Sequence, residues 1–149
     1  MFFLDKFENM KTVYFPKGGT VMVHVEDVGR VVVATTFNGK HGGRYPIGGT
    51  NMKFKKMIEL MYEYLKVEKK VKTVPTFLCY LNGLSMKEKA KKEGKEAGLD
   101  YAKLMTDIMS KDFYYSQETI KNLQNELDFE YKFDVKEGIK SAMEACYDK

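Results

Sequence analysis

The stretch TVMVHVEDVGRVVVATTF, residues 20–37, places a strand directly before a helix. Valines at positions 21, 23 and 25 alternate with other residues, as in a strand that buries one face. From Asp27 onward the apolar residues follow a helical spacing, and an acid after a strand makes a good helix N-cap. We therefore expect a helix that begins at Asp27 and ends at Gly39, although its β-branched residues would equally suit a strand.

The next stretch, GGRYPIGGT at residues 42–50, raises the question of nucleotide binding. Its glycines miss the phosphate-loop pattern G-x-x-x-x-G-K-[ST] by one residue, because Gly49 stands where the lysine should be. The run NMKFKKMIELMYEYLKV that follows, residues 51–67, has apolar residues at three- and four-residue spacing. We expect a strand at 44–49, a tight turn, and an amphipathic helix capped by Thr50 or Asn51.

The rest of the chain predicts further short elements within a single domain, residues 1–149. We expect a strand at 11–15, an extended piece at 72–75, and helices up to residue 110 that break near Gly83 and at 94–98. An extended segment at 113–116, a short helix at 118–127 and an extended connection at 129–135 follow. Asp134 can cap a last helix. The sequence shows no repeats and no low-complexity linker.

The composition is that of an ordinary globular protein, with 44% hydrophobic and 31% charged residues. The net charge is +4, but Arg30 and Arg44 are the only arginines. The lysine-rich run at 87–98 is interleaved with glutamates, which favours a solvated helix over a nucleic-acid site. No apolar run reaches membrane-spanning length and the opening residues do not form a leader, so we expect no membrane partner and a cytoplasmic location.

Cysteine and histidine usage argues against a metal site. Cys79 and Cys146 lie far apart with no histidine beside them, so we expect two free thiols. His24 and His41 are single and scattered, which gives no metal-ligand spacing. His41 is most simply a surface loop residue.

Several motifs in order resemble one family. They are V-x-V-x-D-V at 23–28, R-Y-x-x-G-G at 44–49, TVP at 73–75, and the tail FYYSQETIKNLQNELDFEYKFDVKEGIKSAME at 113–144. Together, over about residues 11–147, they resemble the C-terminal half of extended short-chain dehydrogenase/reductase proteins, the NAD-dependent epimerase/dehydratase family, in its dihydroflavonol-reductase-like or sugar-epimerase-like branches. The resemblance implies an α/β fold, the C-terminal portion of an extended Rossmann-type short-chain dehydrogenase, with a few short strands and several covering helices.

The resemblance also implies where the cofactor binds. In that family NAD(P) is held by an N-terminal glycine fingerprint, which is absent from this chain, so we expect no cofactor on this chain alone. Residues 43–50 would then turn the chain rather than bind a nucleotide. The family's catalytic Tyr-x-x-x-Lys spacing occurs once, at Tyr62 and Lys66, but on the helix after 44–49. We interpret these two as helical neighbours and assign no catalytic residue.

The substrate side of the family is the part that this chain resembles. An arginine that clamps nucleotide-sugar substrates corresponds to Thr20, and no arginine follows Arg44, which argues against a nucleotide sugar. Asn122 and Asp128 also depart from the family pattern, the latter from a glycine, which puts the local turn in doubt. The candidate substrate-binding residues are Thr20, His24, Met105, Phe113 and Tyr114. His24 could equally be a partly buried histidine bonded to the backbone, and Met105 and the aromatic residues could be plain core.

Two functions follow from these patterns. The first is the substrate-binding C-terminal part of an NAD(P)-dependent reductase or epimerase, inactive alone, with a small-molecule substrate and a separately encoded Rossmann half as partner. It predicts an exposed apolar surface on 44–49 and the helix after it. The alternative is a stand-alone, non-enzymatic α/β module that acts through protein contacts or self-association.

Overall fold

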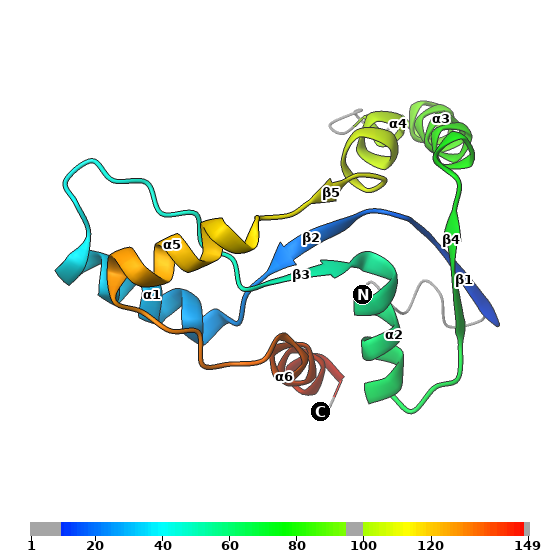
Figure 1. Cartoon of the computed structure of the whole chain (residues 1–149). Coiled ribbons are helices and arrows are strands. Elements are labelled where there is room, and N and C mark those ends of the chain that lie inside the picture. Colours follow the sequence, from blue (N-terminus) through cyan, green and yellow to red (C-terminus); the bar gives the residue numbers. More distant parts are fainter. Residues whose placement is uncertain (1–9, 95–99, 148–149) are drawn as a thin grey trace. The chain divides into compact units, whose positions relative to one another are not determined.

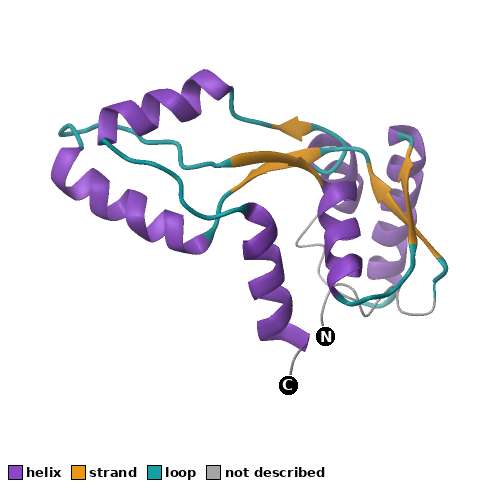
Figure 2. Cartoon of the chain, turned by 60° about the horizontal axis from the view of Figure 1, so that its bottom comes forward, coloured by secondary structure: helices purple, strands orange, loops and turns teal. Residues whose placement is uncertain are grey.

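The computed structural model describes residues 10–94 and 100–147 of the chain. It divides into two compact units, one comprising Met1–Thr20 and Lys53–Phe113 and the other Val21–Met52 and Tyr114–Lys149. We call them unit 1 and unit 2. Figure 1 labels their helices and strands, and Figure 2 distinguishes them by type. The fold is mixed α/β, with short strands and several helices, as the sequence predicted.

The core of unit 1 is built on a pair of parallel strands. Strand β1 (Thr12–Pro16) pairs with β4 (Lys70–Val74), which confirms the extended segments expected there and sets Val13 opposite Val71. Both valines are buried, and Ile58 of helix α2 (Phe54–Tyr64) is fully buried in the same unit. The predicted amphipathic helix therefore exists and buries its apolar face in unit 1.

The remaining elements of unit 1 are mostly helical. They are α3 (Thr76–Lys92), α4 (Tyr101–Lys103), the π-helical turn η2 (Leu104–Ile108) and the short strand β5 (Asp112–Phe113). The break expected near Gly83 is wrong, because Gly83 lies buried inside the continuous helix α3. One glycine costs a helix only about 1 kcal/mol, which the other residues of a long helix outweigh. The break expected at 94–98 falls mostly outside the described residues.

A second small sheet has the strand order β3-β2-β5. Strand β2 (Gly19–Met22) runs parallel to β5, with Gly19 opposite Asp112 and Thr20 opposite Phe113. Strand β2 ends three residues before the end of the strand expected at 20–25, because His24 is the N-cap of the next helix, which begins at Val25. The chain passes from unit 1 to unit 2 within β2 and returns at the end of β3 (Thr50–Lys53).

The strand expected at 44–49 is not formed. Residues 44–49 are a loop, and the strand comes later, as β3. Thr50 and Asn51 therefore do not cap α2, whose N-cap is Lys53. The Asn51 side chain instead bonds the backbone of Tyr115 in both directions, donating to the carbonyl at 2.7 Å and accepting from the N–H at 3.2 Å. A side chain engaged in this way cannot also cap a helix.

Unit 2 is held together by helices and a loop. Helices α1 (Val25–Asn38) and α5 (Gln117–Leu127) lie side by side (Figure 1) and share a core of four buried residues, Val31, Leu123, Leu127 and Phe129. Tyr45 and Ile47 of the loop pack against this cluster. The apolar residues of the loop thus find burial without strand pairing, which explains why no strand forms there.

The helix ends in unit 2 follow ordinary capping rules. Ser116 caps α5, and Asp134 accepts from the Lys136 N–H at 3.1 Å at the start of α6 (Val135–Tyr147), which confirms the predicted last helix. Asp128 closes α5 in the left-handed conformation, with φ of 48°. The local turn is therefore made without the glycine of the resembling family, since aspartate tolerates this region better than most residues.

Candidate functional site

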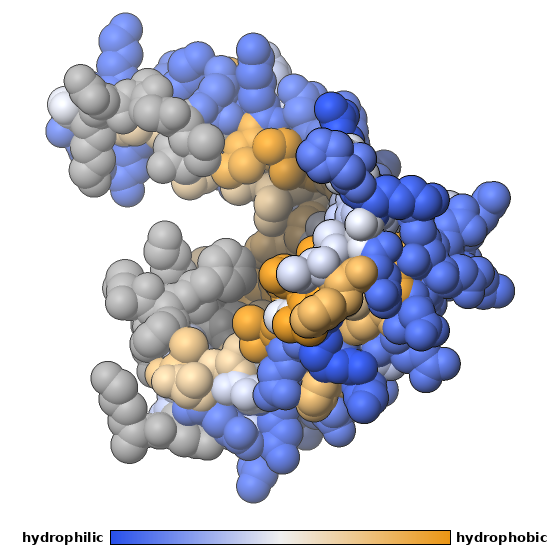
Figure 3. Space-filling view, turned by 90° about the vertical axis from the view of Figure 1, so that its left-hand side faces the viewer, coloured by the Kyte–Doolittle hydropathy of each residue, from blue (hydrophilic) through white to orange (hydrophobic). Residues whose placement is uncertain are grey.

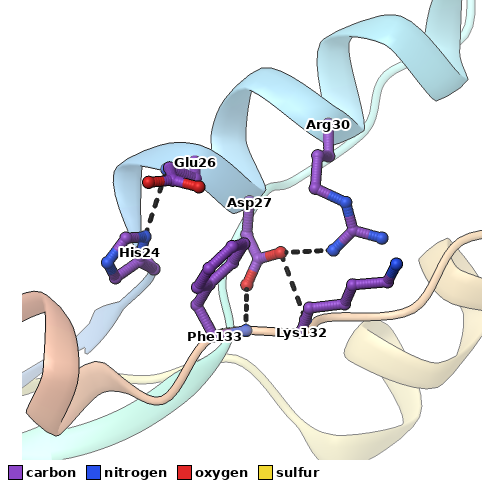
Figure 4. A network of polar contacts seen from close by, with 6 residues as sticks. All are labelled: His24, Glu26, Asp27, Arg30, Lys132 and Phe133. Atoms are coloured by element: carbon purple, nitrogen blue, oxygen red, sulfur yellow. Dashed lines mark hydrogen bonds and ion pairs between the residues drawn. The ribbon is translucent and has the colours of Figure 1, made fainter.

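Asp27 is the centre of a polar network in unit 2. It lies in the first turn of α1 and is fully buried, and its carboxylate accepts from the backbone N–H groups of Lys132 at 3.2 Å and Phe133 at 3.0 Å. The Arg30 guanidinium donates to the same carboxylate at 2.7 Å (Figure 4). Asp27 is therefore not the helix N-cap that the sequence predicted. It anchors the segment after α5 to α1, and its oxygens are engaged by the protein rather than free to act as a base.

His24 takes the capping position that was expected of Asp27. Its Nδ1 accepts from the Glu26 N–H at 3.2 Å, and its ring stacks on Phe133 with centroids 4.7 Å apart. Gly138 gives the ring its room, because a Cβ there would approach Cδ2 of His24 at 2.8 Å. His24 is thus buried and bonded to the backbone, as its structural interpretation predicts. Its contact with a substrate stays a prediction.

Backbone amides of the glycine-rich loop donate hydrogen bonds to other parts of the protein. The Gly48 N–H donates to the Tyr131 hydroxyl at 3.3 Å, and the Gly49 N–H donates to the Met22 carbonyl at 3.0 Å. A phosphate loop needs free amides and a helix that begins directly after it, whereas strand β3 follows here. The loop at 43–50 is therefore not arranged to hold a phosphate.

The other candidate substrate residues lie in two groups. Thr20 and Phe113 are opposite one another on β2 and β5, in unit 1, and Phe113 is half exposed. Met105 belongs to η2 of the same unit, a π-helical turn closed by the Met109 N–H on the Leu104 carbonyl. π-Helical turns occur frequently at functional sites. Tyr114 and His24 belong to unit 2.

A groove in unit 2 runs beside the Asp27 network. It lies between α1 and the segment that follows α5, and its lining is largely apolar, with Gly29, Val33, Ala34 and Phe37 on α1 and Phe129 and Phe133 across from them. Glu26, Arg30, Asp128 and Lys132 supply charges along it. The Arg30 guanidinium lies over the Phe129 ring at 5.1 Å from its centroid. The groove is open, so it can receive an apolar surface or an elongated ligand.

Exposed apolar residues are found on other elements than expected. Tyr45 and Ile47 are partly buried, and Ile58 and Tyr62 of α2 are buried, so the surface predicted on 44–49 and its helix is not there. Large exposed apolar side chains gather instead on α1 and α3, namely Val25, Val32, Val33 and Phe37 on the first and Phe77, Leu78, Tyr80, Leu81, Leu84 and Met86 on the second. Figure 3 shows apolar residues at the surface among polar ones on one face of the molecule.

Tyr62 and Lys66 do not form the helical pair that was expected. Helix α2 ends at Tyr64, and Lys66 lies beyond it with a positive φ of 55°. The cation near the Tyr62 ring is Lys69, with its Nζ 5.4 Å from the ring centroid. Within residues 10–94 and 100–147 the buried Tyr62 hydroxyl has no hydrogen-bond partner. Tyr62 is therefore a buried aromatic residue without the contacts of a catalytic acid.

Tyr62→Phe is expected to stabilise unit 1 slightly and to make it more resistant to alkali. Burial raises the pKa of Tyr62 above its ordinary value of 10.0, so its contribution to stability is complete below pH 10 and is lost as the pH rises through the folded-state pKa. At neutral pH the variant should gain up to about 1 kcal/mol, since it removes an unsatisfied buried hydroxyl. Urea denaturation at about pH 7 and about pH 10.5 measures both effects. Tyr80→Phe, at an exposed position of α3, should lose as much stability between the two pH values as the wild type does. If Tyr62→Phe also loses as much stability as the wild type, the prediction is contradicted.

Metal and membrane sites gain no support. In the part of the chain that the structure describes, no three His, Cys, Asp or Glu side chains gather into a metal site. Both cysteines are free thiols, Cys79 buried and Cys146 half-buried. None of the helices within 10–94 and 100–147 combines the length and apolar character that crossing a membrane requires.

Comparison with known proteins identifies the fold. No protein-family model and no curated protein matches the sequence. Solved structures do match: the protein gox2253, with a TM-score of 0.62 and 20% identity, covers 93% of this chain and 40% of its own. RMD from Pseudomonas aeruginosa, in complex with NADPH, matches with a TM-score of 0.56 and 11% identity over 96% of this chain and 38% of its own. A nucleoside-diphosphate-sugar epimerase from Staphylococcus aureus matches with a TM-score of 0.54 and 16% identity over 95% of this chain and 46% of its own.

The chain shares its fold with part of these three proteins, one of which is named an epimerase and another of which binds NADPH. It spans less than half the length of each of these three structures. At such identities the likeness concerns the fold alone, and the activity of a whole protein of this type does not follow from it.

The groove residues are what sequence reasoning missed. Gly29, Val33 and Phe37 line the groove, and with Val25 before them they recur every fourth residue, which is a helical spacing present in the sequence. The sequence predicted a helical spacing of the apolar residues from Asp27 onward without saying which side is buried, and the structure buries Asp27 and Val31 on the other side of α1. A run that is apolar on both sides of a helix is the signal for a second contact surface.

Proposed function

We propose that these 149 residues form the substrate-binding portion of an NAD(P)-dependent reductase- or epimerase-like protein, and that the cofactor is held by a portion outside them. The observation that carries the proposal is the match of at least 93% of this chain to part of each of three solved structures. One of these is named an epimerase and another holds NADPH. A chain that corresponds to 38–46% of such proteins supplies only part of their machinery.

The residues of this chain support a division of labour. The sequence contains no G-x-G-x-x-G run, which is the pattern that brings a dinucleotide pyrophosphate to a helix N-terminus. The glycine-rich loop at 42–49 uses the amides of Gly48 and Gly49 internally. The candidates for substrate contacts are Thr20, Met105 and Phe113 within unit 1 and, taken separately, His24 and Tyr114 within unit 2. The substrate would be a small molecule without a nucleotide, since arginine clamps are missing.

The proposal is tested by comparing this chain with the native protein from which it comes. NADPH fluorescence is titrated against the 149 residues alone and against the native protein, purified with any polypeptide that accompanies it. We expect saturable binding only for the native protein. Sequencing the coding DNA on both sides of these residues should then locate a glycine-rich βαβ unit and a Tyr-x-x-x-Lys helix.

Two results would contradict this function. Saturable NADPH binding by the 149 residues alone would show that the cofactor needs no other portion. The second result is a native protein that binds no NADPH and has no glycine fingerprint in the flanking DNA or in an accompanying polypeptide. The similarity to the solved structures would then concern the fold and not the function.

A second candidate function has its own observation. Val25, Val32, Val33 and Phe37 are exposed on the same helix, so exposed apolar side chains gather there rather than being scattered singly. Such a surface favours a module that acts through protein contacts. Under this function the chain binds no nicotinamide cofactor and forms a defined assembly.

A further inference from the structure

Helix α3 presents an apolar stripe to solvent at its N-terminal end. The residues that this helix buries are Cys79 and Gly83. Leu81 lies two positions from each of them, about 200° around the helix, so it points away from the body of unit 1. Phe77 and Leu84, four and three positions from Leu81, lie on the same stripe. Phe77 is 64% exposed and Leu81 is 55% exposed, so unit 1 leaves this stripe uncovered.

Two more apolar residues widen the stripe. Leu78 and Tyr80 are exposed on either side of it, and residues 76–86 contain no charged side chain. A helix of this length extends about 16 Å, which is roughly half the thickness of the hydrocarbon of a bilayer. Such a segment is too short to cross a membrane but long enough to lie in its surface. The expectation of no membrane partner concerned crossing, so it does not bear on this arrangement.

Lysines flank the apolar stripe. Residues 87–92 of α3 contain four lysines and one acid, Glu88, and strand β4, which leads into α3, contains two lysines and no acid. Glu93 after the helix and Asp100, which pairs with Lys87 at 3.5 Å, offset part of this charge. The positive charge of the chain, +4 in all, is therefore concentrated around the stripe.

We propose that α3 binds the surface of an anionic membrane, with the stripe among the lipid chains and the lysines at the level of the headgroups. A lysine side chain can lie along an apolar surface while its ammonium reaches a phosphate. Phe77 and Tyr80 suit the boundary between chains and headgroups, where aromatic side chains are enriched in membrane proteins. Burial of the stripe and attraction of the lysines then act together.

The combination of features favours lipid over other occupants. Protein interfaces are depleted in lysine and enriched in arginine, whereas the cations of α3 are all lysines. A second copy would bring like charges together. A nucleic acid would use the lysines but has no need of the aliphatic Leu81 and Leu84. A surface that is apolar inside and anionic at its boundary uses both the stripe and the lysines.

The first test is co-sedimentation with vesicles, for the full chain and for the native protein from which it comes. The vesicles contain phosphatidylcholine alone or with about 30% phosphatidylserine. We expect both proteins to bind the anionic vesicles, and to bind the neutral ones at least about tenfold more weakly, because each lysine near an anionic surface contributes about fivefold in affinity.

Variants separate the two contributions. Leu81→Glu should weaken binding to the anionic vesicles at least about tenfold, since it places a charge among the lipid chains. The double variant Lys91→Gln/Lys92→Gln should weaken it about thirtyfold, because two lysines are lost. Val33→Glu makes the same charge change at a position of α1 that is 57% exposed, and should leave binding unchanged. Circular dichroism checks that each variant keeps the wild-type helix content.

Several results would overturn the proposal. One is a full chain that binds neither kind of vesicle, or both equally well. Another is binding by the full chain but not by the native protein, since the portion outside these residues would then cover α3. A third is binding that Leu81→Glu leaves intact while the lysine variant loses it together with binding to poly(U) RNA, which would indicate a general polyanion surface. The inference is independent of the reductase or epimerase proposal, because NADPH titration and vesicle binding are separate measurements and either can fail alone.

Discussion

Replacing Asp27 by alanine is expected to lower the free energy of unfolding of unit 2 by about 3–5 kcal/mol. The carboxylate is fully buried and accepts from Lys132 N–H, Phe133 N–H and Arg30. Alanine would leave the part-buried N–H groups of Lys132 and Phe133 and the Arg30 guanidinium without their acceptor. A polar group that is shielded from water and loses its partner costs more than the hydrogen bond contributes. Urea denaturation followed by circular dichroism measures the loss.

Amide hydrogen exchange locates the effect. The Lys132 and Phe133 amides should lose their protection in Asp27→Ala, since Asp27 is their acceptor. Glu26→Gln changes the neighbouring, exposed acid and should alter stability by no more than about 0.5 kcal/mol. A loss below about 1 kcal/mol in Asp27→Ala would mean that the network does not hold unit 2 together.

Gly18→Ala is expected to destabilise unit 1 by about 3 kcal/mol, the upper end of the range for overpacking. A Cβ at this position would collide with the backbone oxygens of Met109 and Lys111, which cannot rotate away as a side chain would. The same backbone groups accept from the Gly18 N–H at 3.0 Å and the Gly19 N–H at 3.1 Å. Relieving the collision would therefore break the contact between β2 and the end of the helical segment.

Stability and exchange measurements check this second prediction. Gly18→Ala should unfold at a lower temperature than the wild type, and its Gly19 amide hydrogen should exchange faster. Lys17→Ala, at the adjacent exposed position, should change stability by no more than about 0.5 kcal/mol. If both alanine variants are equally stable, the close approach at Gly18 is not present in solution.

Much of the fold could be predicted because its signals are local. The strand at Val13, the helix that buries Ile58 and the last helix capped by Asp134 each follow from side-chain period and capping chemistry within a few residues. The motif order from residue 23 to residue 144 also indicated an α/β fold like that of NAD(P)-dependent epimerases and reductases, and solved structures of an epimerase and of an NADPH-bound protein share the fold of this chain.

The errors have a common physical origin. Asp27 follows a strand, as a helix N-cap would. Its carboxylate oxygens, however, accept hydrogen bonds from backbone amides more than 100 residues later in the sequence, so a rule about helix starts could not predict its role. The Asn51 side chain is likewise engaged by a residue distant in the sequence, through two hydrogen bonds with the backbone of Tyr115. Tyr45 and Ile47 alternate as strand residues do, yet they are buried by a helical cluster rather than by a sheet.

The sequence by itself determined the period of each element, the absence of a dinucleotide fingerprint and the stripe that runs from Val25 to Phe37. Only the tertiary structure decided which side of α1 is buried. The side with Asp27 and Val31 is buried because its packing and hydrogen-bond partners come from residues distant in the sequence. Local chemistry fixes where a helix can form. The residues that happen to meet it in space fix what it buries and what it leaves for a partner.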